Sequence, residues 1–355
     1  MIRNKLIQLL LSPFSLLYGF VVSLRNISYR YGLLKGVEFN LPVISVGNLT
    51  IGGAGKTPHI EYLIRLLKDH INIATLSRGY GRKTSGFFLV HHGNTAEQVG
   101  DEPLQFRRKF PEILVGIGEN RTFAIPQLLM DEPDLQVILL DDAFQHRSVK
   151  PGLNILLTEY SQPFSQDFLL PAGRLREWRS AYHRADVIIV SKCPYTWSDS
   201  IRQKMMETLE PLPYQTLYFS YYEYDAPFYI FNRKNIIPLQ SNWTILLVSA
   251  IARTEYLVDY LEEQVETVKL LQYEDHHYFS NYDVSHIKKT FENIETPNKI
   301  ILTTEKDAMR LELHRKYLME HRLPVLVLPV RVAFHEQDGQ KFDDAIKQYL
   351  LDFKA

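Results

Sequence analysis

A glycine-rich turn between an apolar stretch and a helical pattern constrains the fold of this chain more than any other feature. Residues 45–58 read SVGNLTIGGAGKTP. The amides of such a turn and the N-terminus of the helix behind it form an anion site, in which the lysine reaches phosphate oxygens and the threonine hydroxyl binds Mg²⁺. Thr50 replaces the usual first glycine, and the remaining glycines still let the backbone approach a phosphate closely. The residues predicted to bind a nucleoside triphosphate are Thr50, Gly52, Gly53, Ala54, Gly55, Lys56 and Thr57.

The composition excludes several classes of protein. With 355 residues, of which 45% are hydrophobic and 23% charged, the chain is long enough for two domains and is typical of a folded globular protein. Its net charge of −1 lacks the positive excess of nucleic-acid-binding proteins, so we expect no nucleic-acid partner. Cys193 is the only cysteine, which excludes an intrachain disulfide and a cysteine-based metal site and fits a reducing compartment.

An uncharged apolar segment near the N-terminus indicates contact with a membrane. Residues 6–24 carry no charged side chain, and Arg3, Lys5, Arg25 and Arg30 flank them. A helix of this length lies near the lower limit for crossing a bilayer, and its proline and serines weaken it as a span. Three alternatives stay open: a helix lying in the membrane interface, a spanning helix and a buried core helix. The basic flanks favour contact with anionic lipid headgroups.

Short apolar stretches alternate with amphipathic patterns along most of the chain, which is typical of a parallel α/β sheet. The expected strands of the first part are 43–46, 71–76, 113–116, 137–140, 155–157 and 187–190, and its expected helices are 59–68, 103–109, 121–130 and 201–209. Aromatic stretches at 218–222 and 228–231 indicate a β-ribbon or edge strands. A second alternation follows, with strands expected at 245–249, 300–303 and 325–328 and helices at 254–263, 284–291, 306–319 and 342–351.

We therefore predict an α/β fold: a P-loop NTPase-type parallel sheet domain with an N-terminal hydrophobic helix, plus a smaller α/β C-terminal domain joined by a β-ribbon. The expected limits are 1–35 for the membrane-associating helix, 36–215 for the core domain, 216–240 for the ribbon and 241–355 for the smaller domain. The last helix of the smaller domain is free to pack back on the core.

An acidic pair follows the most apolar of the expected strands. Strand 137–140 ends in Asp141-Asp142, where P-loop enzymes place the carboxylate that holds Mg²⁺. The alternative is a helix N-cap, and the glycine-rich turn upstream favours the metal site. Gln145 and His146 follow at the carboxyl edge of the sheet, where ligands gather.

Two basic loops also follow expected strands. They read LSRGYGRK at 76–83 and PAGRLRE at 171–177, and in each of them glycine lets the backbone turn while Arg78 or Arg176 can pair with phosphate. Each loop reads equally well as an ordinary solvated basic turn. The first loop follows the second strand, and this position beside the glycine-rich turn favours a functional role for it.

Three further motifs carry groups for acid–base chemistry. Asp101 in GDEP at 100–103 reads as a helix cap or as a general base toward an attacking hydroxyl. His276 and His277 in YEDHHYF suggest zinc, but a third ligand at the usual spacing is missing, and either imidazole can instead orient a carboxylate across a cleft between domains. TTEKD at 303–307 reads as a nucleotide contact or, slightly better, as a capped helix start.

Taken together, these motifs resemble the tetraacyldisaccharide 4'-kinase family, the lipid A 4'-kinases of Gram-negative bacteria. The resemblance rests on SVGNLTIGGAGKTP, LSRGYGRK, GDEP, LLDDAFQHR, PAGRLRE, DHHYF and TTEKD, which follow one another between residues 45 and 307. It implies a Mg²⁺- and ATP-dependent kinase of the 4'-hydroxyl of an acylated disaccharide 1-phosphate. It also implies a smaller domain that closes over ATP, a place at the cytoplasmic face of the inner membrane, and a protein that we expect to act as a monomer.

The resemblance also implies roles for particular residues. Asp101 and His276 match the pair that activates the sugar hydroxyl, and Lys56 and Arg176 complete the expected catalytic set. Thr57, Asp141 and Asp142 match the metal contacts. The residues expected to contact the lipid substrate are Asn48, Ser77, Arg78, Tyr80, Gln145, His146 and Glu177.

The chain departs from the family pattern at two places. Ala143 stands where the family commonly has glycine, and residues 250–254 read AIART where it often has AIGNP. Two rival functions stay open: a P-loop GTPase or ATPase, for which VSKCP at 190–194 lacks the aspartate of a guanine-reading element, and a non-catalytic nucleotide sensor at the membrane.

Overall fold

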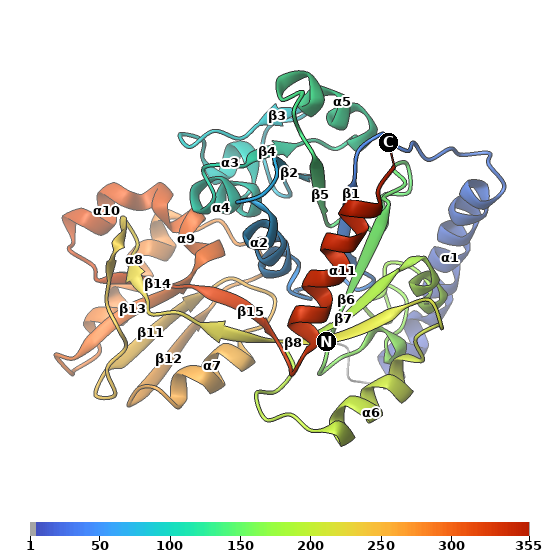
Figure 1. The fold of residues 1–355 in the computed structure, drawn as a ribbon. Coiled ribbons are helices and arrows are strands. Elements are labelled where there is room, and N and C mark those ends of the chain that lie inside the picture. The colour runs from blue at the N-terminus through green and yellow to red at the C-terminus, as the bar shows by residue number, and fades with distance from the viewer. Residues whose placement is uncertain (1–4, 355) are drawn as a thin grey trace.

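The structure is a computed structural model that describes residues 5–354, and it contains two β-sheets that share one cavity between them (Figure 1). The large sheet has the strand order β15-β8-β7-β6-β1-β5-β2-β4-β3. Its strands are parallel except for β3 and β15, which run antiparallel to β4 and β8. The strands are β1 (Val43–Asn48), β2 (Ile73–Ser77), β3 (Phe88–Leu89), β4 (Leu114–Ile117), β5 (Val137–Asp141), β6 (Leu153–Glu159), β7 (Val187–Ser191), β8 (Thr216–Tyr224) and β15 (Val330–Phe334).

Helices cover both faces of the large sheet, as near-continuous apolar strands require. Every residue of β1, β2, β5 and β7 is buried. One apolar cluster joins the sheet to α2, α4 and α11, and two others join its opposite face to α5 and α6. These helices are α2 (Lys56–Leu67), α3 (Ala96–Val99), α4 (Asp101–Lys109), α5 (Arg121–Asp131), α6 (Asp199–Leu209) and α11 (Asp338–Asp352).

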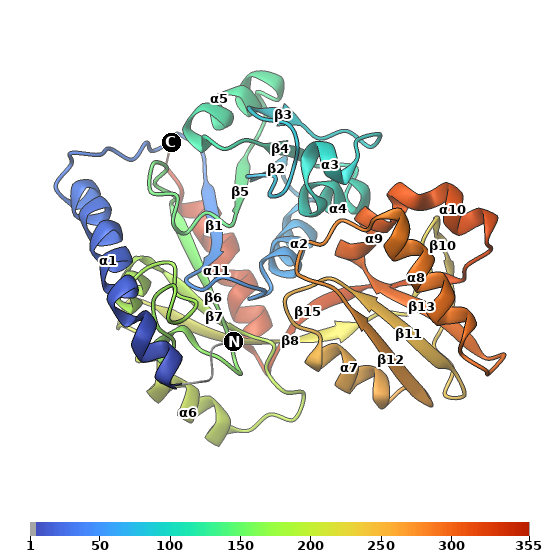
Figure 2. The same cartoon turned by 180° about the vertical axis from the view of Figure 1, so that it is seen from behind.

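The small sheet has the order β10-β9-β14-β13-β11-β12, and its four neighbouring strands β11 to β14 are parallel. Its strands are β9 (Phe228–Tyr229), β10 (Asn232–Ile236), β11 (Thr244–Ser249), β12 (Thr267–Gln272), β13 (Lys299–Thr304) and β14 (Val325–Leu328). Its helices are α7 (Glu255–Glu262), α8 (Asn281–Glu292), α9 (Glu305–Leu311) and α10 (Arg315–Glu320). Both views show α7 on one face and α8 to α10 on the other (Figure 2).

The chain passes between the sheets twice, and this arrangement confirms the predicted fold class. β8 leads from the large sheet toward the small one, and β15 returns antiparallel to it, so the two strands form the ribbon. The predicted domain limits stay a prediction. The prediction let the last helix return to the core, and in the structure β15 returns together with α11.

Two predicted elements differ from the structure, and the prediction lacks the strands β3, β10, β12 and β15 and the helix α3. The expected helix 306–319 is divided into α9, a 3₁₀ turn (Glu312–His314) and α10. The stretch 218–222 lies inside β8, whose start pairs with β7 in the large sheet. β12 is missing from the prediction because this edge strand buries little of its surface, so its sequence TVKLLQ carries no continuous apolar run.

The N-terminal helix α1 (Lys5–Arg30) lies along the flank of the large sheet (Figure 1). Within residues 5–354 it is the helix that is long and apolar enough to cross a membrane: an 18-residue window of it has a mean hydropathy of 1.8, and only 11% of that window is buried. The core-helix alternative is therefore wrong. The structure does not test whether α1 spans a bilayer or lies in its interface, and Arg3 falls outside the described residues.

Candidate active site

The glycine-rich turn joins β1 to α2 at the carboxyl edge of the large sheet. Gly52 and Gly55 have φ angles of 105° and 86°, which other residues rarely adopt. A Cβ at Gly55 would also lie 2.2 Å from the Tyr222 hydroxyl, so both the backbone angle and the close contact require glycine at this position. Lys56 begins α2, and its Nζ donates to Asn48 Oδ1 at 3.2 Å. The local sequence therefore shapes a turn that only glycine can form and holds its lysine beside the adjoining strand.

Asp141 is a buried carboxylate that lacks a partner. It ends β5, beside Val46 of β1, and it is 1% exposed. Neither of its carboxyl oxygens has a hydrogen-bond partner, and burial followed by repulsion from Glu102 raises its pKa to about 8. A bound cation would stabilise its ionised form, because carboxylate oxygen is a ligand that Mg²⁺ prefers. Thr57 lines the same cavity, so these two residues fit a magnesium ion.

Asp142 has the opposite environment. Arg176 donates to both of its oxygens, at 3.1 Å and 2.8 Å, and Lys56 Nζ lies 3.7 Å from Oδ1. Burial by itself raises the pKa of Asp142, but Lys56 and Arg176 lower it further, so the net pKa lies well below the usual range. Arg176 also donates to the Asn48 carbonyl at 2.7 Å. The second basic loop is therefore attached to the acidic pair and to the strand of the glycine-rich turn.

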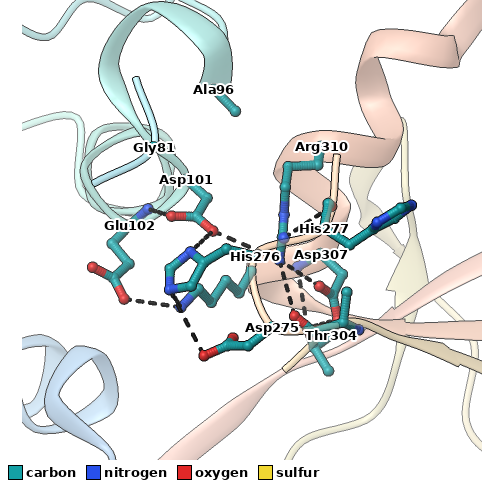
Figure 3. A network of polar contacts seen from close by, with 12 residues as sticks. Gly81, Ala96, Asp101, Glu102, Asp275, His276, His277, Thr304, Asp307 and Arg310 are labelled. Atoms are coloured by element: carbon teal, nitrogen blue, oxygen red, sulfur yellow. Dashed lines mark hydrogen bonds and ion pairs between the residues drawn. The ribbon is translucent and has the colours of Figure 1, made fainter. Parts of the chain in front are cut away.

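Asp101 and His276 meet where the two sheets face each other (Figure 3). Asp101 begins α4 and is 3% exposed, and its Oδ2 lies 3.2 Å from His276 Nδ1. His276 has a φ of 61° in the loop after β12, and its amide donates to the Ala250 carbonyl at 3.1 Å. Its ring lies 4.7 Å from that of Tyr80. The contact therefore joins residues from three loops that are far apart in the sequence.

The neighbouring His277 belongs to a different group. Its Nε2 lies 3.0 Å from Asp283 Oδ2, and its ring stacks on Tyr273 at 4.8 Å. It does not line the cavity, whereas His276 does. Among residues 5–354 no group of three His, Cys, Asp or Glu side chains is placed to hold a metal ion, so nothing supports a zinc site here.

Cationic side chains gather at the end of the cavity nearest α1. Arg121 is 2% exposed and donates to the carbonyls of Gly118 and Asp141, and burial lowers its pKa to about 10. His146 Nε2 is buried without a partner, and burial followed by Arg121, Arg25 and Arg78 lowers the pKa of this imidazole to about 4. The imidazole is therefore neutral at pH 7 beside a group of arginines, an arrangement suited to an anion.

All of these groups border one cavity of about 760 Å³. The predicted residues that line it are Thr50, Gly52, Gly53, Ala54, Gly55, Lys56, Thr57, Ser77, Arg78, Tyr80, Asp141, Asp142, Gln145, His146, Arg176 and His276. Three predicted residues do not line it. Asp101 lies behind His276, Asn48 bonds Lys56 and Arg176, and Glu177 is buried against Arg184 and Asn26.

Sequence reasoning missed several residues of the cavity wall. Arg121 starts a helix, and an arginine there gives no signal of its own. Lys192 lies in VSKCP, a segment that the sequence analysis interpreted only as an incomplete guanine-reading element. Its Nζ lies 4.4 Å from the centre of the Tyr256 ring, and both residues line the cavity. Lys306 and Glu102 belong to motifs that were noted without a role for these two side chains.

The two departures from the family pattern have different surroundings. Ala143 is buried and is not among the residues of positive φ found in the described chain, so alanine fits there without strain. Residues 251–253 line the cavity opposite the glycine-rich turn, and Arg253 donates to Ser161 Oγ at 3.2 Å and lies 3.4 Å from Glu159. In this chain the second departure therefore adds an ionic contact between the two sides.

Comparisons with known proteins agree on one family. A sequence model described as "Tetraacyldisaccharide-1-P 4'-kinase" matches residues 7–351. The chain is 43% identical to a tetraacyldisaccharide 4'-kinase of Bacteroides thetaiotaomicron over 96% of this chain and 92% of that protein. It is 42% identical to one of Flavobacterium johnsoniae, covering 97% and 98%. A crystal structure of LpxK from Aquifex aeolicus in complex with ATP is similar, with a TM-score of 0.73, 28% identity and coverage of 97% and 99%.

Proposed function

Because the chain belongs to the tetraacyldisaccharide-1-P 4'-kinase family, we propose that it transfers the γ-phosphate of ATP to the 4'-hydroxyl of an acylated disaccharide 1-phosphate in this cavity. The observation that carries the proposal is the cavity wall, where a glycine-rich turn, an unpartnered buried aspartate and an Asp–His pair converge from the two sheets. Neither rival function is favoured by a feature of this site.

The nucleotide end of the cavity lies at the glycine-rich turn. Lys56 and the amides of the turn would bind the phosphates, and Thr57 with Asp141 would hold Mg²⁺. Bound there, Mg²⁺ would neutralise the charge that develops during transfer. Arg176 keeps Asp142 ionised and joins the basic loop to this end of the site.

Asp101 and His276 serve the acceptor hydroxyl. Phosphoryl transfer needs a positioned base more than a strong one. In the proposal the His276 ring, which lines the cavity, takes the hydroxyl proton and gives its Nδ1 proton to Asp101 behind it, so that Asp101 is the final acceptor.

The arginines near α1 suit the 1-phosphate of the lipid. Arg25 of α1, Arg78 and Arg121 all line this end, and Arg25 lies on the helix that meets the membrane. Charge-assisted hydrogen bonds from arginine fit phosphate geometry well. The acyl chains would then extend toward the exposed apolar face of α1.

Replacing Arg78 by glutamine is expected to raise the KM for the lipid roughly 10- to 100-fold, the effect of one charge-assisted hydrogen bond. The Arg78 side chain is exposed, and within residues 5–354 it forms no hydrogen bond or ion pair that this change would break. The KM for ATP should change little, and the effect should vanish with a substrate analogue that lacks the 1-phosphate. Steady-state kinetics with both lipids measure this, and an equal effect on both would place Arg78 elsewhere in the site.

We also propose that α1 holds the enzyme at the cytoplasmic face of the inner membrane, where it works as a monomer. Replacing Leu10, Leu17 and Phe20, all more than half exposed, by serine is expected to weaken binding to anionic vesicles by roughly 100-fold or more, since each apolar side chain contributes about 1.5–3 kcal/mol. Co-sedimentation measures the loss. Leu351→Ser, on the exposed side of α11, is the control, and unchanged sedimentation of the triple variant would refute the anchor.

The decisive experiment is transfer of γ-labelled phosphate from ATP to a tetraacyl disaccharide 1-phosphate in detergent micelles. Label in the lipid that depends on Mg²⁺ supports the proposal. Hydrolysis of ATP without label in the lipid would overturn the substrate assignment. GTP in place of ATP, at equal concentration, tests the GTPase alternative in the same assay.

A further inference from the structure

Lys306 joins the Asp–His pair to the opposite wall of the cavity, and the function proposed above gives it no role. It lies in the TTEKD motif and is the second residue of α9, directly after β13. Its Nζ lies 3.0 Å from Glu102 Oε1 on α4 and 3.1 Å from His276 Nε2. The Lys306 ammonium group therefore contacts the His276 imidazole at Nε2, whereas Asp101 contacts the same ring at Nδ1.

This contact decides where the imidazole carries its proton. An ammonium group has donors and no acceptor, so the His276 Nε2 next to it must be the unprotonated nitrogen. The single proton of the neutral ring then sits on Nδ1, which donates to Asp101 Oδ2 at 3.2 Å. We propose that Lys306 is a positioning residue that fixes this tautomer of His276 and thereby keeps Asp101 an ionised, proton-accepting carboxylate.

The charges around the pair agree with this role. Burial by itself raises the pKa of Asp101, but the charge of Lys306, the hydrogen bond and charge of His276, and the charge of Arg310 lower it further, so the net pKa lies well below the usual range. Arg310 also lies 3.6 Å from Asp101 Oδ2 and is bound to Asp307 Oδ1 at 2.6 Å. The titratable and charged groups that face the pair are Tyr80, Glu102, Asp275, Tyr278, Lys306 and Arg310.

A plain ion pair between helices is the alternative reading. α4 and α9 pack side by side, and two further cations of α4 cross between them: Lys109 contacts Glu305 at 2.6 Å, and Arg108 contacts Glu312. Neither of these cations touches Asp101 or His276. They therefore offer matched controls for a contact that only holds the two helices together.

The test compares full-length Lys306→Met with the wild type in detergent micelles, through the pH dependence of kcat/KM for the lipid at saturating ATP. Removing the cation that lowers the pKa of Asp101 raises the pKa of this carboxyl, so the acid limb of the kcat/KM profile should move to higher pH by about one unit. Above the limb, kcat should fall roughly 10-fold through the lost orientation. Lys306→Arg, which keeps the cation, should return the limb toward its wild-type position.

Arg108→Met is the control, because it breaks a contact between the same helices without touching the pair. It should lower the Tm and leave the acid limb in place. If the acid limb of the kcat/KM profile stays in place in Lys306→Met and the Tm falls as much as in Arg108→Met, the proposal is overturned in favour of a plain ion pair. A rise in the KM for ATP without a shift of the limb would overturn it in favour of a phosphate ligand.

The proposal rests on the proposed function, and a second measurement separates the two. Nitrogen chemical shifts of the His276 ring report its tautomer without any turnover. If the wild-type ring carries its proton on Nδ1 and Lys306→Met loses that preference, the positioning role of Lys306 stands. It then stands even if the transfer assay finds no labelled phosphate in the lipid. A ring protonated on Nε2 in the wild type would overturn the role even in an active kinase.

Discussion

Replacing Lys56 by alanine is expected to lower kcat for phosphate transfer to the lipid by roughly 10³-fold, or about 4 kcal/mol of transition-state stabilisation. Lys56 begins α2 beside the glycine-rich turn, and its Nζ lies 3.2 Å from Asn48 and 3.7 Å from Asp142. It is therefore held at the point where charge gathers on the transferred phosphoryl group. Steady-state kinetics of the purified variant at saturating ATP and lipid give the effect.

The control for this variant lies at the other end of the same helix. Lys68 follows the last turn of α2 and pairs with Glu112 at 2.6 Å, far from the turn. Lys68→Ala should keep its activity within about twofold, since exposed ion pairs contribute little. Near-normal turnover by Lys56→Ala would show that the glycine-rich turn does not hold the transferred phosphate.

Replacing Asp101 by asparagine is expected to lower kcat by roughly 10²- to 10⁴-fold, the usual contribution of a general base. Asparagine keeps the size of the side chain but removes the charge that receives the proton. The KM for ATP should stay within a few-fold of the wild type, because Asp101 lies behind His276 and does not line the cavity. Separate titrations of ATP and lipid at the pH optimum measure the two effects.

Asp283→Asn is a matched control, because Asp283 holds the neighbouring His277 at 3.0 Å as Asp101 holds His276. Asp283 also caps α8, so its replacement should lower the Tm while kcat stays close to normal. If Asp283→Asn lost as much kcat as Asp101→Asn, the assignment of the chemistry to His276 rather than His277 would be wrong. A rise in the KM for ATP with unchanged kcat in Asp101→Asn would make Asp101 a binding or capping residue.

The two histidines show where sequence reasoning stops. They are adjacent in the chain, and either one can orient a carboxylate, so the pattern HH by itself does not choose. The choice depends on the left-handed backbone at His276, which turns its ring toward Asp101 and leaves His277 against Tyr273 and Asp283. Asp101 lies 175 residues earlier, and a single sequence carries no record of such a contact.

The basic residues show a similar division. Arg78 and Arg176 stand beside glycines in loops that follow strands, so sequence alone made them candidates. Arg121 and Lys306 lie at the starts of helices without such neighbours, and they became visible only because the fold points them into the cavity. Glu177 shows the converse, since its place beside Arg176 suggested a substrate contact while its side chain is buried against Arg184.

The sequence alone determined the strand–turn–helix around Lys56, the buried strands, the apolar helix at the N-terminus and, through its motifs, the family. Glycine freedom, apolar runs and short motifs are properties of neighbouring residues, so one chain is enough to reveal them. Only the tertiary structure decided that His276 meets Asp101, that Lys306 touches that histidine, and that β15 and α11 return to the large sheet. These contacts join segments far apart in the chain, and their stability comes from packing between the two sheets rather than from any local pattern.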